Sequence, residues 1–173
     1  MRIAYSAART IVEHAAARSP REACGLLAGK GALISLALPV ANAAAMPEQE
    51  FALAPDEQLR GLKEIDERGL DWLGVYHSHP VSPPIPSQSD RSGAVDSALL
   101  QLIVSLENPK PRLKLWRIDG ATVLPLELDF AGAPSTDDAG ELTSNQRLGM
   151  LAAGLLSVLA LLAMAMALLP PTP

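Results

Sequence analysis

The sequence predicts an α/β domain over residues 1–130, and three observations support this prediction. Apolar residues recur at helical spacing through 7–17, and 55–68 has Pro55 near its start and Gly69 just past its end, as helices do. Several apolar segments of strand length are bounded by turn residues. Helix-like and strand-like segments are interspersed, which favours a sheet covered by helices.

The elements follow in order. The first helix should end at Ser19-Pro20, and Gly29-Lys30-Gly31 should be a hairpin turn. Ser87 or Ser89 could cap a further helix that runs to about Ser97. Asp119-Gly120 is a strong hairpin signal between the last two strands. The expected strands are 24–28, 33–40, 72–77, 99–105, 112–118 and 122–128.

The end of the chain differs in composition from the rest. Residues 131–147 are mostly small and polar and predict a flexible linker. Residues 148–169 contain no charged side chain and would form a helix of roughly 33 Å, about the thickness of the bilayer core. We therefore expect a single C-terminal transmembrane helix followed by a short tail, 170–173. A buried core helix or a partner-binding helix is the alternative.

Composition limits the classes of binding partner and the cellular location that we expect. The net charge is −5 with no basic stretch, which argues against nucleic acid as a partner. The single cysteine excludes an intrachain disulfide. The first 17 residues lack an uninterrupted apolar stretch, so a cleaved signal peptide is not expected. These features, with Arg147 before the apolar segment, place the main domain on the cytoplasmic side of the membrane.

The segment 77–90 holds the most informative residues. His77 and His79 are two apart, so on an extended backbone both imidazoles point to one side. Asp90 can return a carboxylate to the same place on a loop. Two histidines, one carboxylate and one position left for water form a catalytic zinc pattern.

A zinc hydrolase also needs a base and an oxyanion donor. Glu22, at the start of the first long strand, is the candidate base, and the hydroxyl of Ser87 is the candidate donor. Pro83, Pro84 and Pro86 would stiffen the loop that carries Ser87.

These residues together resemble the JAMM (MPN+) zinc metallopeptidase family, in its compact prokaryotic form. The resemblance rests on Glu22 with Cys24-Gly25-Leu26-Leu27, on His77-Ser78-His79-Pro80, and on the spacing to Ser87 and Asp90. It implies one zinc ion with a bound water on His77, His79 and Asp90, Glu22 as general acid and base, and Ser87 as oxyanion donor. It also implies a cytidine-deaminase-like MPN domain, with a curved and mostly antiparallel sheet flanked by helices.

The implied reaction is hydrolysis of a peptide or isopeptide bond at the C-terminus of a ubiquitin-like or sulfur-carrier protein. Such a tail would lie extended in a groove and could be held by strand addition at a sheet edge. The membrane, through residues 148–169, would be a second partner.

Other interpretations compete with this one. The domain could be a non-catalytic MPN scaffold that binds a protein partner, or a RadC-like protein near DNA. Ser87 and Asp90 could serve only as a helix cap. Cys24 is more typical of a small buried residue than of a nucleophile. His14 is expected to be structural or exposed, and Trp72 and Trp116 are expected in the core.

Overall fold

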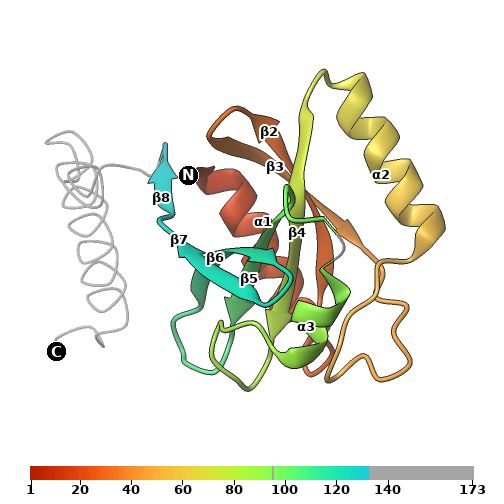
Figure 1. Cartoon of the computed structure of the whole chain (residues 1–173), viewed down its shortest axis with the longest axis vertical. Helices are drawn as coiled ribbons and strands as arrows, with labels where there is room; N and C mark the ends of the chain where they lie inside the picture. Colours follow the sequence, from red (N-terminus) through yellow and green to blue (C-terminus); the bar gives the residue numbers. More distant parts are fainter. Residues whose placement is uncertain (95, 133–173) are drawn as a thin grey trace, which may run out of the picture. The chain divides into compact units, whose positions relative to one another are not determined.

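A computed structural model describes residues 1–94 and 96–132, which fold around one eight-stranded sheet (Figure 1). The strand order is β7-β6-β5-β4-β2-β3-β1-β8. The strands are β1 Arg2–Ala4, β2 Cys24–Lys30, β3 Leu33–Val40, β4 Asp71–His79, β5 Leu100–Ser105, β6 Arg112–Asp119, β7 Thr122–Leu126 and β8 Asp129–Ala131. The helices are α1 Tyr5–Arg18, α2 Pro55–Glu67 and α3 Gln88–Gly93.

The sheet is mixed and strongly curled. Antiparallel pairs join β2 to β3 and β4, and β6 to β5 and β7, whereas β4–β5, β1–β3 and β1–β8 are parallel. β7 and β8 lie at opposite ends of the strand order, yet only Glu127 and Leu128 separate them in sequence. Two residues reach at most about 10 Å, so the sheet must curl until its edges approach each other. The predicted α/β class with a curved sheet is confirmed.

The two faces of the sheet carry different helices. α1 packs against β1, β3, β4 and β5 over the largest apolar cluster, which includes Ile3, Ile11, Leu27 and Leu102. α2 covers a second cluster on the other face, around Leu26 and Ile65. β4 alternates between the faces, since Tyr76 joins the α1 cluster whereas Val75 packs under α2.

Most predicted elements are found, with differences at the ends. α1 ends at Arg18, next to Ser19-Pro20, as expected. α3 ends at Gly93 rather than near Ser97, and the last predicted strand stops at Leu126. The short strands β1 and β8 were not predicted; β8 begins just before the expected linker.

The expectations for the end of the chain fall outside the described residues. These are the linker 131–147, apart from its first two residues, the transmembrane helix 148–169 and the tail 170–173. Within 1–94 and 96–132, no helix has the length and hydropathy needed to cross a membrane.

Candidate metal centre

The carboxyl end of β4 carries His77 and His79 on one face of the sheet. Because alternate residues of a strand point to the same face, the two-residue spacing of His77 and His79 brings their rings together. The two Nε2 atoms are 3.2 Å apart, and both side chains are buried. The predicted pairing of the two imidazoles is confirmed.

Asp90 reaches the histidines from α3. Its Oδ1 lies 3.3 Å from His77 Nε2, and its Oδ2 lies 3.5 Å from His79 Nε2. A capping box holds the carboxylate: the Ser87 N–H donates to Asp90 Oδ2 at 2.7 Å, and the Asp90 N–H donates to Ser87 Oγ at 3.1 Å. The helix cap and the metal-facing carboxylate therefore use the same two residues.

The three side chains fit a tetrahedral cation. Zinc bonds of about 2.0–2.1 Å place tetrahedral ligands roughly 3.3–3.4 Å apart. The two Nε2 atoms are 3.2 Å apart, and each lies 3.3 or 3.5 Å from one of the two Asp90 carboxylate oxygens, which is close to this spacing. Each residue offers one ligand atom, these atoms lie within 4.8 Å of one another, and all three residues are buried. Three protein ligands, two histidines and one carboxylate, would leave the fourth tetrahedral position of a zinc ion open, as in catalytic zinc sites.

The electrostatics of these groups keep the carboxylate ionised. Burial alone would raise the pKa of Asp90, but its contacts with His77 and His79 outweigh burial and hold that pKa well below its usual range. Burial lowers the pKa of His77, which favours the neutral imidazole that a metal requires. For His79, burial is outweighed by Asp90 and by the Pro83 carbonyl, so its pKa is raised.

Glu22 precedes β2, the strand that pairs with β4. Cys24 pairs with His77, and the Ser78 N–H donates to the Ala23 carbonyl at 2.9 Å, so the antiparallel register continues to Glu22 and His79. Directly opposed side chains share one face, at about 5 Å between Cβ atoms. The sequence prediction that Glu22 points into this site is consistent with the register.

The carboxyl of Glu22 has the protonation behaviour of a general base. It is buried, and its Oε2 has no hydrogen-bond partner in the described part of the chain. Burial raises its pKa to about 7; His79 opposes the shift, whereas Asp90 and Glu50 add to it. A carboxyl near neutrality can both accept and return a proton. A cation held by the histidines would lower this pKa again.

Ser87 keeps a proton to donate. Its Oγ accepts the Asp90 N–H and lies 2.8 Å from Ser89 Oγ. The capping bond uses only an oxygen lone pair, and either hydroxyl can be the donor in the contact with Ser89. When Ser89 donates, the Ser87 hydrogen is available to another acceptor beside Asp90.

Cys24 does not have the environment of a nucleophile. The side chain is fully buried, and its thiol points to the Val40 carbonyl at 3.6 Å. Burial raises the pKa of the thiol to about 12, and Glu22 adds to the effect. The reactive thiolate is therefore disfavoured at neutral pH, which argues against a cysteine protease.

The proline-rich loop after β4 is fixed through its carbonyl groups. His79 Nδ1 lies 2.8 Å from the Pro83 carbonyl, Ser105 Oγ donates to the Ser82 carbonyl at 2.7 Å, and Trp116 Nε1 donates to the Pro84 carbonyl at 3.0 Å. Proline offers no N–H, so carbonyl oxygens are the groups left for anchoring. Trp116 is thus a core residue, as predicted, that also anchors this loop.

Asn42 organises the segment between β3 and α2, which sequence reasoning passed over. Its amide donates to the carbonyls of Glu22 and Glu50, and its oxygen accepts the N–H groups of Ala44 and Ala52, all at 3.0 Å. The side chain therefore uses both donors and both acceptor positions. It connects the backbone of Glu22 to the segment that contains Phe51.

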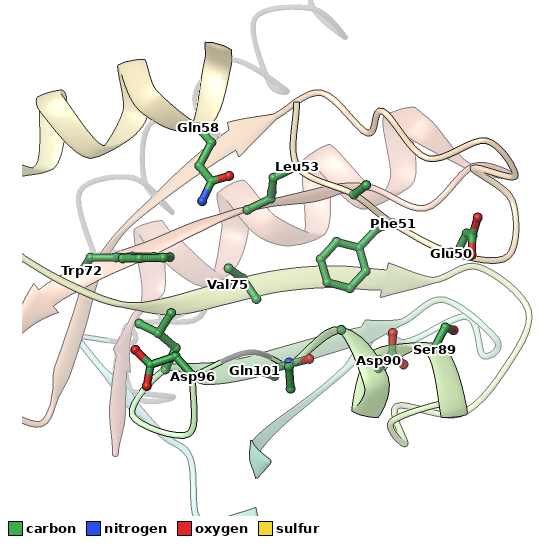
Figure 2. A pocket seen from close by; sticks show the side chains of 14 residues that line it. Glu50, Phe51, Leu53, Gln58, Trp72, Val75, Ser89, Asp90, Asp96 and Gln101 are labelled. Atoms are coloured by element: carbon green, nitrogen blue, oxygen red, sulfur yellow. The ribbon is translucent and has the colours of Figure 1, made fainter. Parts of the chain in front are cut away.

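A groove of about 410 Å³ runs from Asp90 along β4 toward Trp72 (Figure 2). One wall is the segment 50–53, the floor includes Val75 and Gln101, and α3 lies on the far side. Trp72 is half-buried: it packs against the apolar cluster beneath α2 and also lines the groove, so its predicted place in the core is confirmed in part. Gln101 is buried, and its Oε1 has no partner among the described residues.

Several known proteins are similar in sequence to this chain. The desampylase of Haloferax volcanii is 42% identical over 95 residues, which cover 54% of this chain and 68% of that protein. The CysO-cysteine peptidase of Mycobacterium tuberculosis is 31% identical over 115 residues, which cover 64% of this chain and 78% of that protein.

The fold is shared as well. A protein of Desulfitobacterium hafniense solved in solution matches with a TM-score of 0.71 at 32% identity, over 79% of this chain and 97% of that one. The family described as prokaryotic homologs of the JAB domain matches residues 5–119, which is more than half of the chain. The chain therefore belongs to the family of prokaryotic JAB-domain homologues.

Proposed function

We propose that this protein is a zinc-dependent peptidase that hydrolyses a peptide or isopeptide bond at the C-terminal tail of a ubiquitin-like or sulfur-carrier protein. One observation carries the proposal: Glu22 is buried, its Oε2 has no hydrogen-bond partner among the described residues, and it is close enough to His79 and Asp90 for their charges to shift its pKa. A structural metal site has no need of such a base. The names of the relatives, a desampylase and a CysO-cysteine peptidase, support the same reaction class.

His77, His79 and Asp90 would hold the zinc, which supplies Lewis-acid polarisation of the scissile carbonyl and a lowered pKa for water. Glu22 takes a proton from the attacking water as the carbon–oxygen bond forms. The same carboxyl then delivers that proton to the leaving amine as the carbon–nitrogen bond breaks. The Ser87 hydroxyl donates to the oxygen that gains negative charge.

The groove offers a way to hold an extended tail. β4 is paired on both sides and cannot accept another strand, but the segment 51–53 is extended and has one free edge. The Ala52 N–H and carbonyl bond to residues 42 and 43, whereas the backbone groups of Phe51 and Leu53 have no partner among the described residues. Because backbone groups alternate along a strand, these free groups point away from residues 42 and 43. A peptide could pair with them and lie over Val75.

The test incubates the full chain, loaded with zinc, with a substrate in which a ubiquitin-like protein is joined to another protein by an isopeptide bond. The parent should cleave after the C-terminal residue of the ubiquitin-like protein, and Glu22→Gln should cleave about 10²–10⁴-fold more slowly while it retains zinc. Full activity in Glu22→Gln would contradict the assigned base.

A non-catalytic scaffold that binds a protein partner is the alternative function. It predicts that the purified parent holds no zinc and leaves the conjugate intact, so metal content measured on the same sample separates the two functions. Attachment to a membrane through residues 148–169 remains a prediction, which flotation of the full chain with vesicles tests.

A further inference from the structure

The two histidines of the metal centre are held in different ways. His79 lies with Nδ1 2.8 Å from the Pro83 carbonyl, so its Nδ1–H can donate there and leave Nε2 free for a metal. His77 Nε2 lies 3.3 Å from Asp90 Oδ1, and when this nitrogen binds a metal the neutral ring carries its proton on Nδ1. That Nδ1 is buried and has no hydrogen-bond partner in the described part of the chain. The usual second contact that orients a metal-binding histidine is therefore missing at His77.

Phe51 contacts His77 at this place. The two rings are stacked, with centroids 4.3 Å apart and planes inclined by 16°. His77 is fully buried, whereas Phe51 is half-buried and also lines the groove. The Phe51 segment is fixed by Asn42, which binds the Glu50 carbonyl on one side and the Ala52 N–H on the other. The stacked ring is thus held by a well-anchored backbone.

We propose that Phe51 is a positioning residue of the metal centre, whose stacked ring sets the plane of His77 in place of the missing hydrogen bond. The inference rests on the proposed zinc site and concerns the geometry of one ligand. A flat ring at this separation prevents the imidazole from rotating about its χ2 angle, and an aliphatic side chain of similar volume does not. Nε2 then stays directed at the point that it shares with His79 and Asp90.

The experiment compares Phe51→Leu, Phe51→Tyr and the control Leu53→Ala, which alters the same wall without a stacked contact to His77. Zinc dissociation constants are measured on the full chain by competition with a chromophoric chelator. We expect Phe51→Leu to bind zinc about 10–100-fold more weakly, the usual effect of losing a group that orients a ligand. Phe51→Tyr, which keeps the ring, and Leu53→Ala should bind zinc as the parent does.

Cobalt substitution gives a second readout that a loss of stability alone does not change. The visible absorption bands of bound Co²⁺ report ligand geometry, so they should shift in Phe51→Leu and return in Phe51→Tyr. If Phe51→Leu does not fold, Phe51→Met is measured in the same way. Parental zinc affinity and a parental cobalt spectrum in a folded variant without the ring would overturn the inference. A parent that binds no zinc would overturn the proposed function as well.

Discussion

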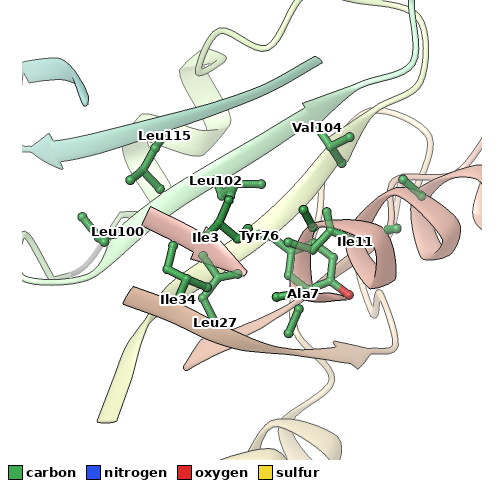
Figure 3. Packing of buried hydrophobic residues seen from close by; sticks show 14 residues of the cluster. Ile3, Ala7, Ile11, Leu27, Ile34, Tyr76, Leu100, Leu102, Val104 and Leu115 are labelled. Atoms are coloured by element: carbon green, nitrogen blue, oxygen red, sulfur yellow. The ribbon is translucent and has the colours of Figure 1, made fainter. Parts of the chain in front are cut away.

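The two faces of the curled sheet differ in how fully their buried polar groups are satisfied. On the α1 face, the largest apolar cluster surrounds Tyr76 (Figure 3). The Tyr76 hydroxyl lies 2.8 Å from His14 Nδ1. On the other face, Glu22 Oε2, His77 Nδ1 and Gln101 Oε1 are buried without partners, and they are the only such side-chain atoms among the described residues. Buried polar atoms are normally paired, so the concentration of these unpaired atoms on one face supports the proposal that the functional site is on that face.

The largest expected effect comes from replacing Asp90, one of the three proposed zinc ligands on the second face. Asp90→Asn keeps the size of the side chain and an oxygen for the Ser87 N–H, but it removes the charge. Zinc affinity, measured by chelator competition, should fall by more than the roughly 10–100-fold that loss of an outer contact costs. Ser87→Ala is the control, since it removes the cap hydroxyl at a cost of about 1 kcal/mol and leaves the ligands. Parental affinity in Asp90→Asn would contradict the site.

Glu22→Gln should stabilise the zinc-free protein at alkaline pH. The pKa of Glu22 is raised from 4.5 to about 7, chiefly by burial, so its folded form prefers the proton and loses stability as pH rises through this range. Glutamine removes that loss. The free energy of unfolding from urea titration should be higher than in the parent by on the order of 1–3 kcal/mol at pH 8, with little difference below pH 4.5. An equal difference at both pH values would show that the effect is not ionisation.

Asn42→Ala should loosen the groove wall. The variant loses four hydrogen bonds and leaves the carbonyls of Glu22 and Glu50 without their donor. We expect a loss of about 1–3 kcal/mol in urea unfolding, together with faster amide exchange at Ala44 and Ala52. Asn108→Ala is the matched control, because Asn108 is exposed and makes one long contact of 3.4 Å. The role assigned to Asn42 fails if both variants are equally stable.

Tyr76→Phe on the α1 face should have the smallest effect. It removes only the hydroxyl that pairs with His14, at a cost of about 0.5–1.5 kcal/mol. Conjugate cleavage and zinc affinity should stay at the parental level, since Tyr76 faces away from the metal centre. A loss of cleavage comparable to that of Glu22→Gln would show that the two faces are not functionally distinct.

The sequence predicted which side chains converge on the second face better than it predicted the residues that hold them in place. His77 and His79 follow from the two-residue period of a strand, and Asp90 and Glu22 follow from residue type and spacing. Phe51 and Asn42 lie in an irregular segment with no periodicity, and their partners are far away in sequence. The strands β1 and β8 have three residues each and pair with distant strands, so no local pattern marks them.

The position of bound zinc would show whether His77, His79 and Asp90 form the metal site. A crystal of the full chain grown with zinc can be measured at the zinc absorption edge, where anomalous scattering identifies the ion. We predict one strong peak enclosed by His77 Nε2, His79 Nε2 and Asp90, with its open side toward Glu22. A folded protein with no anomalous peak there, or with zinc bound only elsewhere, would contradict the proposed zinc site.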